Sequence, residues 1–318
     1  MPNKDFMSEP LRLHQLRVHQ LNDDAPARRE RNLYRLGNAN WEAFQALDLD
    51  IGVFVASAMK WKKVIDGVDY PWLVWSMNED WCYVQQKLVE EVGWTPIVGY
   101  DPRRGVPTKL SKNAVLIDFN EHQKLPVMWM HVPIDFIFMF AKKRMAFWHA
   151  DLLCNSKNMT YLSQLFRGLA DGEAAIVNPT SKFGLGRLLQ PKQHRYWELA
   201  GCFTRGASQH MFDHGCSLWQ QFAYHPNCPD KAEFDERRQY YWDSGSGILY
   251  WHKRYRPRVR LISERRLALG HFTRINRQGF KTVSPNNEQR DGGADLDLNF
   301  TIEQAMSVVG LDPAVLAS

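Results

Sequence analysis

Apolar runs bounded by turn residues divide this chain into alternating strand-like and helix-like segments. Short apolar runs rich in β-branched and aromatic residues predict buried strands, whereas apolar positions recurring every three or four residues predict amphipathic helices. Trp81 to Val92 has the helical spacing, with Val84, Leu88 and Val92 on one stripe, and Gly93 ends it. The other predicted strands cover residues 49–58, 71–76, 95–98, 114–117, 174–177 and 259–262, and the other predicted helices cover 28–47, 134–143, 158–170 and 301–309.

This order predicts an α/β protein with a mixed, mostly parallel, Rossmann-like sheet flanked by helices. We expect residues 1–48 to be an N-terminal extension, 49–285 the main domain and 286–318 a tail with a short helix. No apolar run reaches the roughly 18 residues needed to span a membrane. The N-terminus is polar, and the five cysteines include no CxxC pair. These features predict a cytoplasmic protein with reduced thiols and without a transmembrane segment.

One apolar run ends in a pair of residues suited to ligand chemistry. Met145 to Trp148 reads as a buried strand, and His149 and Asp151 follow it. Side chains at positions i and i+2 of a strand point the same way, so both can face one ligand. Ligands of open α/β sheets lie beyond the carboxyl ends of the strands. An imidazole and a carboxylate at that place suit a divalent metal that holds phosphate oxygens, and therefore an enzyme with a nucleotide-activated substrate.

The order of these parts resembles a GT-A-type glycosyltransferase, through short motifs between about residues 50 and 275. The motifs are the basic segment Ser57 to Lys63 after the first predicted strand, then His149-Ala150-Asp151, and finally His271. The resemblance implies that the first motif, through Ser57, Lys60 and Lys63, holds the nucleotide. It implies that Asp151 and His149 hold Mn²⁺ or Mg²⁺ on the diphosphate of a nucleotide-sugar donor. His271 would reach the same metal.

The second motif departs from the family's pattern, because His149 stands where the family has an acid. Only Asp151 is then a hard oxygen ligand, and an imidazole suits Mn²⁺ better than Mg²⁺. His149 would alternatively contact the diphosphate directly, with the metal weakly held or absent. The simplest structural alternative makes Asp151 a helix N-terminal acid and His149 a packing residue.

The resemblance also implies an acid that deprotonates an acceptor hydroxyl if the reaction inverts configuration. Asp243, in the glycine-flanked segment before Gly245, is the first candidate, and Asp213 is its rival. An aspartate before glycine is also common in simple turns. Asp80 follows the predicted strand 71–76 and would contact ribose or base, although an acid in the first turn of a helix is the commoner role.

A basic stretch keeps a second class of function open. Residues 251–281 carry ten basic residues and one acid, which indicates an anionic partner. The acceptor would be a glycan or a nucleic acid, or the chain would be a non-catalytic nucleic-acid-binding protein. A sugar-nucleotide hydrolase or nucleotidyltransferase on a similar sheet is a further alternative. His210 and His214 have the spacing of zinc ligands on a helix, but the sequence offers no clear third ligand.

Overall fold

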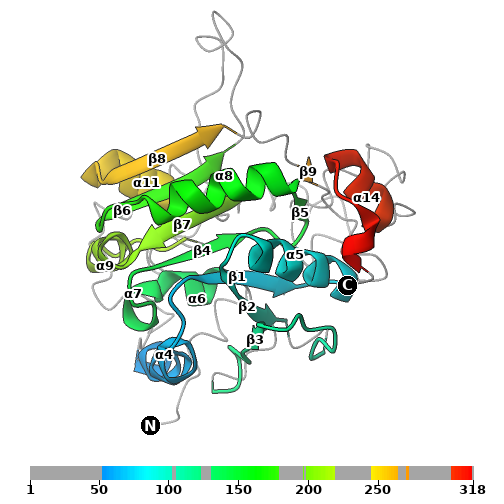
Figure 1. The fold of residues 1–318 in the computed structure, drawn as a ribbon. Helices are drawn as coiled ribbons and strands as arrows, with labels where there is room; N and C mark the ends of the chain where they lie inside the picture. The colour runs from blue at the N-terminus through cyan, green and yellow to red at the C-terminus, as the bar shows by residue number, and fades with distance from the viewer. Residues whose placement is uncertain are drawn as a thin grey trace, which may run out of the picture.

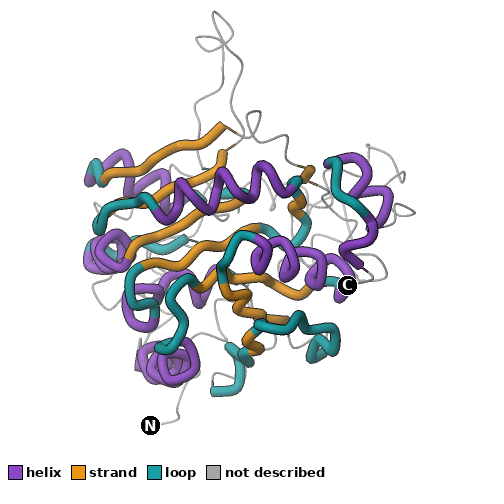
Figure 2. The backbone as a smooth tube through the Cα atoms, in the orientation of Figure 1, coloured by secondary structure: helices purple, strands orange, loops and turns teal. Residues whose placement is uncertain are grey.

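A computed structural model describes residues 52–101, 105–122, 130–178, 196, 198–218, 245–263, 270–271 and 302–316. Seven strands form one mixed sheet, and helices cover both of its faces (Figures 1 and 2). Six of the strands are parallel, and β7 runs against its neighbours β4 and β6. In order across the sheet the strands are β3 (Val115–Leu116), β2 (Thr95–Tyr100), β1 (Pro71–Ser76), β4 (Arg144–Trp148), β7 (Ala200–Thr204), β6 (Glu173–Asn178) and β8 (Arg258–Ser263).

The central strands are buried on both faces, which explains their continuous apolar sequences. In β1 every residue is buried, and alternate side chains enter two different cores. Leu73 and Trp75 pack into one core, and Trp72 and Val74 pack into the other. The first face carries α4 (Gly52–Ile65), α6 (His131–Asp135), α7 (Ile137–Phe140), α9 (Arg205–Asp213) and α11 (Ser246–Tyr255), and the second carries α5 (Glu79–Glu91), α8 (Ser156–Arg167) and α14 (Ile302–Val309).

The strand predicted over residues 49–58 is wrong. Residues 52–65 form the helix α4, and the first strand of the sheet is β1. Four apolar residues at helical spacing, Phe54, Ala58, Trp61 and Ile65, are at most 3% exposed. A short apolar run fits a strand and a buried helix equally well, and this i, i+4, i+7, i+11 spacing is what distinguishes them.

Most other predicted elements are confirmed within the residues that the structure covers. Asn78 caps α5 and Asn155 caps α8 through their side chains. Gly93 follows α5 with a φ of +71°, a conformation that favours glycine. The helix predicted over 134–143 is instead two short helices, α6 and α7, with an interruption at Phe136. The predicted helix over 28–47 lies outside the described residues.

The C-terminal helix packs into the same core as the main sheet. Four of its apolar side chains, Ile302, Ala305, Met306 and Val309, join the core on the α5 and α8 face. They lie beside the small sheet of β5 (Leu152–Leu153) and β9 (Gly270–His271), as Figure 1 shows. In the portion of the chain that the structure describes, no helix is both long and apolar enough to cross a membrane.

The strand order reverses direction next to β1. The chain passes from β1 to β2 and β3 on one side of β1, and β4 then returns on its other side. The chain therefore leaves the carboxyl ends of β1 and β4 toward opposite edges of the sheet, which makes their junction a topological switch point. Open α/β sheets bind their ligands at such a switch point, beyond the carboxyl ends of the strands.

Candidate functional site

The turn after β4 places His149 and Asp151 at this switch point. Two main-chain bonds shape the turn: His149 N donates to Leu199 O at 2.8 Å, and Leu152 N donates to His149 O at 3.1 Å. Gln85 of α5 then holds the turn from the second face, because its Nε2 donates to both His149 O and Leu152 O at 2.8 Å. The Gln85 side chain is fully buried. The turn is therefore fixed by a neighbouring strand and by a helix.

The His149 ring lies between two carboxylates. Its Nδ1 is 3.9 Å from Asp151 Oδ1, and its Nε2 is 3.6 Å from Glu198 Oε1. The side chain of His149 is 22% exposed, whereas those of Asp151 and Glu198 are 5% and 1% exposed. An imidazole thus presents one edge to each of two buried acids, at distances slightly longer than a hydrogen bond.

The small sheet brings the backbone of His271 to the same place. In the antiparallel pair of β5 and β9, His271 lies opposite Leu152, the residue after Asp151. The backbone of His271 therefore lies near His149 and Asp151, beyond the carboxyl end of β4, although about 120 positions separate His271 from the other two. The structure describes the backbone of His271 and not its side chain.

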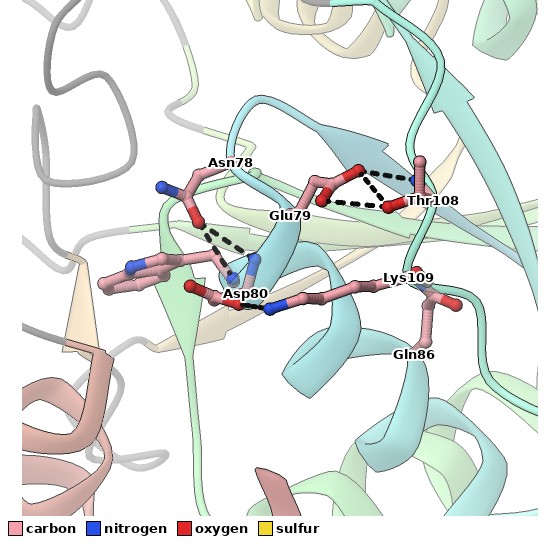
Figure 3. A network of polar contacts seen from close by, with 7 residues as sticks. Asn78, Glu79, Asp80, Gln86, Thr108 and Lys109 are labelled. Atoms are coloured by element: carbon pink, nitrogen blue, oxygen red, sulfur yellow. Dashed lines mark hydrogen bonds and ion pairs between the residues drawn. The ribbon is translucent and has the colours of Figure 1, made fainter.

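A polar network surrounds the N-terminus of α5, next to the carboxyl end of β1 (Figure 3). Asn78 Oδ1 accepts hydrogen bonds from Asp80 N at 3.0 Å and from Trp81 N at 3.3 Å. Asp80 forms an ion pair with Lys109, and Glu79 accepts from the backbone and hydroxyl of Thr108. Asp80 is therefore an acid of the first helical turn, and it pairs with the 105–111 segment near the carboxyl end of β1.

The nucleotide role expected for Ser57, Lys60 and Lys63 rested on a turn that does not exist. All three lie on the helix α4, where Ser57 is fully buried and the two lysines are exposed. Lys60 Nζ is 3.5 Å from His122 Nδ1. The residues that follow the carboxyl end of the first strand are instead Met77, Asn78 and Glu79.

Asp213 lies at the opposite end of the sheet from His149. Because β7 is antiparallel, its last residue, Thr204, pairs with Arg144, the first residue of β4. The helix α9 starts there, at the amino ends of the parallel strands, and Asp213 ends it, exposed and accepting a hydrogen bond from Gln209 at 2.7 Å. The structure does not bring Asp213 to the switch point, and Asp243 lies outside the described residues.

His210 and His214 belong to a packed aromatic cluster beside Asp213. Trp251 Nε1 donates to His210 Nδ1 at 2.9 Å, and His214 Nδ1 lies 2.7 Å from the backbone oxygen of His210. The rings of His214 and Tyr255 are in contact, with centroids 4.2 Å apart and planes tilted by 50°. Trp251 is fully buried, so it packs in the core and does not line a sugar site. Burial and the neighbouring His214 lower the pKa of His210, and its Nδ1 already accepts the hydrogen bond from Trp251.

Sequence reasoning missed two residues of the site, Glu198 and Gln85. Glu198 is the one charge between Trp197 and Thr204 in an otherwise apolar and small-residue segment, and this isolation was the available signal. Gln85 looks like any glutamine of an amphipathic helix, and only its complete burial reveals its role. Buried polar side chains need partners, so such residues mark places where geometry is fixed.

The described side chains form no group of three His, Cys, Asp or Glu arranged to hold a metal ion. His149 and Asp151 supply two donors that face each other, and His271 is described only by its backbone. Comparison of the sequence with models of known protein families gives no match, and comparison with curated proteins gives none either.

Proposed function

We propose that this chain is a glycosyltransferase of GT-A type that moves a sugar from a nucleotide-sugar donor to an acceptor hydroxyl with the help of a divalent cation. The observation that carries the proposal is the meeting of His149, Asp151 and His271 at the switch point beside β1. The mixed, mostly parallel sheet supports it as well, since this is the kind of sheet that the resemblance implies. Ligands at such switch points are commonly nucleotides.

The residues at the turn fit a cation with nitrogen and oxygen ligands. Asp151 offers a carboxylate oxygen and His149 an imidazole nitrogen on the same side of the turn. This donor set suits Mn²⁺ better than Mg²⁺. His271 is the third residue that we assign to the cation, on the strength of the resemblance, and its backbone lies beside the turn, opposite Leu152. The bound cation would neutralise negative charge on the leaving diphosphate.

The carboxyl end of β1 supplies the other wall of the donor site. Asn78 and Asp80 stand there at the start of α5, and Asp80 has a side chain that is 47% exposed. An exposed carboxylate beside a nucleotide site can accept hydrogen bonds from ribose hydroxyls. We assign that contact to Asp80. On the resemblance alone, we assign to Asp243 the role of the base that deprotonates the acceptor hydroxyl.

A thermal-shift experiment tests the proposal. UDP, GDP, CMP, TDP and their sugars are screened with and without Mn²⁺ on the wild type, on Asp151→Ala and on Asp213→Ala. A ligand of the folded state must raise its melting temperature by mass action. We expect one nucleotide family to stabilise the wild type and Asp213→Ala in a metal-dependent way, and not Asp151→Ala. Equal shifts in both variants, or none with any nucleotide, would contradict it.

An exposed basic surface favours a second candidate, a nucleic-acid-binding protein. Five basic residues line the last turn of α11 and the edge strand β8, and each is exposed: Lys253, Arg254, Arg256, Arg258 and Arg260. Arg260 already forms an ion pair within the chain, since its Nη2 lies 2.6 Å from Glu173 Oε2. Charged residues also protect an edge strand from pairing with other chains. Binding to single-stranded DNA or RNA that weakens steeply with salt and needs neither nucleotide nor metal would favour this candidate.

A further inference from the structure

A buried carboxylate lies behind the His149 ring, on the side away from Asp151. Glu198 Oε1 is 3.6 Å from His149 Nε2, whereas Asp151 faces Nδ1. The antiparallel pairing of β7 with β4 is what brings Glu198 there, because Ala200 pairs with Trp148, the last residue of β4. Each nitrogen of one imidazole therefore has its own acid, and the two acids come from different segments of the chain.

Two residues near the Glu198 carboxylate have left-handed backbone conformations. Glu198 has a φ of +28°, which is rare for a residue with a side chain. Gly245, which precedes α11, has a φ of +78°, and a Cβ on it would lie 2.0 Å from both Glu198 Oε2 and Tyr196 O. Left-handed backbone at a residue other than glycine costs about 1–3 kcal/mol and persists only where the surroundings enforce it. Both positions are thus adapted to one carboxylate.

The electrostatics of Glu198 require a donor on its imidazole side. The side chain is 1% exposed, and its Oε2 has no hydrogen-bond partner among the described residues. A buried carboxylate without donors is strongly unfavourable. Two features offset this: the N-terminal end of α11 at Gly245, where the helix dipole is positive, and the His149 ring. Among the described residues, His149 Nε2 faces Oε1 at 3.6 Å and can supply an N–H to it.

We infer that Glu198 is a positioning residue, which accepts the Nε2 proton of His149 and so fixes the tautomer whose Nδ1 lone pair faces Asp151. An imidazole that binds a cation commonly donates its other N–H to a carboxylate behind it, which orients the ring. The Nδ1 lone pair and the Asp151 oxygen then face each other across 3.9 Å, a gap that favours a cation. Such contacts are often long before the ligand arrives and tighten in the complex. The consequence for donor binding rests on the proposed function, whereas the tautomer does not.

Nitrogen NMR of the full chain tests the tautomer directly. Protein labelled with ¹⁵N in histidine is recorded by long-range ¹H–¹⁵N correlation at alkaline pH, and His149→Gln identifies the signal. We expect protonated Nε2 and unprotonated Nδ1 in the wild type. Glu198→Gln should keep this pattern, because its amide oxygen still accepts, and Glu198→Ala should mix the tautomers. A ring with protonated Nδ1 in the wild type, or one unaffected by Glu198→Ala, would overturn the inference.

Titration with Mn²⁺ alone supplies the second readout. Loss of an outer-shell partner typically weakens metal binding by about 10–100-fold, so we expect that loss in Glu198→Ala and a smaller one in Glu198→Gln. Failure to fold of the alanine variant leaves the wild-type tautomer and Glu198→Gln to decide. If the tautomer follows Glu198 but no nucleotide binds, the positioning role stands and the transferase proposal falls. If nucleotides bind with the opposite tautomer, the positioning role falls and the transferase proposal stands.

Discussion

Two histidines at opposite ends of the sheet use their ring nitrogens differently. His149, beyond the carboxyl end of β4, has one acid 3.9 Å from Nδ1 and another 3.6 Å from Nε2. His210, on α9 near the amino ends of the parallel strands, accepts a hydrogen bond of 2.9 Å from Trp251 Nε1. The first ring contacts ionisable groups at distances that can still shorten, and the second is held by a neutral donor at normal length.

Under the proposed function, the difference separates a histidine that binds a ligand from one that packs. A hydrogen bond of normal length from a buried indole satisfies His210 without any ligand. The contacts of His149 instead gain from rearrangement when charge arrives. Histidine content alone therefore does not locate a site, and the geometry of the neighbours does. The following changes test this contrast, from the largest expected effect to the smallest.

Gly245→Ala should damage the His149 end most severely. The new Cβ meets Glu198 Oε2 and Tyr196 O, and alanine resists the φ of +78°. We expect a loss of about 3 kcal/mol or more in the free energy of unfolding, measured by urea denaturation. Gly67→Ala is the matched control, because a Cβ there has nothing within 4 Å. Equal stability of the two variants would show that Gly245 and Glu198 are not closely packed.

Gln85→Leu should loosen the turn that carries His149 and Asp151. Two hydrogen bonds of 2.8 Å are lost, and the backbone oxygens of His149 and Leu152 lose their donor. We expect a loss of about 2–3 kcal/mol in unfolding free energy together with weaker Mn²⁺ binding. Gln164→Leu changes an exposed glutamine of α8 in the same way and should alter neither property. Unchanged Mn²⁺ affinity in Gln85→Leu would show that Mn²⁺ binding does not depend on the turn that Gln85 holds.

Trp251→Phe should affect the other end of the sheet alone. Phenylalanine keeps an aromatic ring but removes the hydrogen bond to His210 and part of a fully buried side chain, so the expected loss is about 1–2 kcal/mol in unfolding free energy. Binding of nucleotide and Mn²⁺ should stay as in the wild type, by calorimetry. A marked fall in ligand affinity would mean that the two ends of the sheet are coupled.

The smallest effect that we expect is a change in how stability depends on pH. Burial is the main cause that lowers the pKa values of His210 and His252 from 6.5 in the folded chain. The unfolded chain therefore binds protons first as the pH falls below 6.5, and stability decreases until the folded-state pKa values are passed. Above pH 6.5 the contribution is complete. His210→Gln should flatten the dependence in thermal melts between pH 5 and 7.5, and an unchanged slope would contradict the assignment.

The sequence predicts the strands that are buried on both faces, because such strands are continuous apolar runs. It fails at residues 52–65, where an apolar run of similar composition is the helix α4. At the site, His149, Asp151 and His271 could be singled out because each stands at or just beyond an apolar segment. Glu198 was missed because it precedes its strand and the rule about carboxyl ends looks for residues that follow one, so its isolation among apolar and small residues was the only sign of it.

Because β7 is antiparallel to β4, the residue that it brings to the ligand end comes before the strand and not after it. A parallel strand delivers to the ligand edge only what comes after it, so a longer loop there moves the residues that follow. β7 delivers Glu198 as it enters the sheet, and its register with β4 fixes that residue from the downstream side. Residues that follow Glu198 in the chain therefore hold it in place, and the pairing of β7 with β4 is what a redesign of this end of the sheet has to preserve.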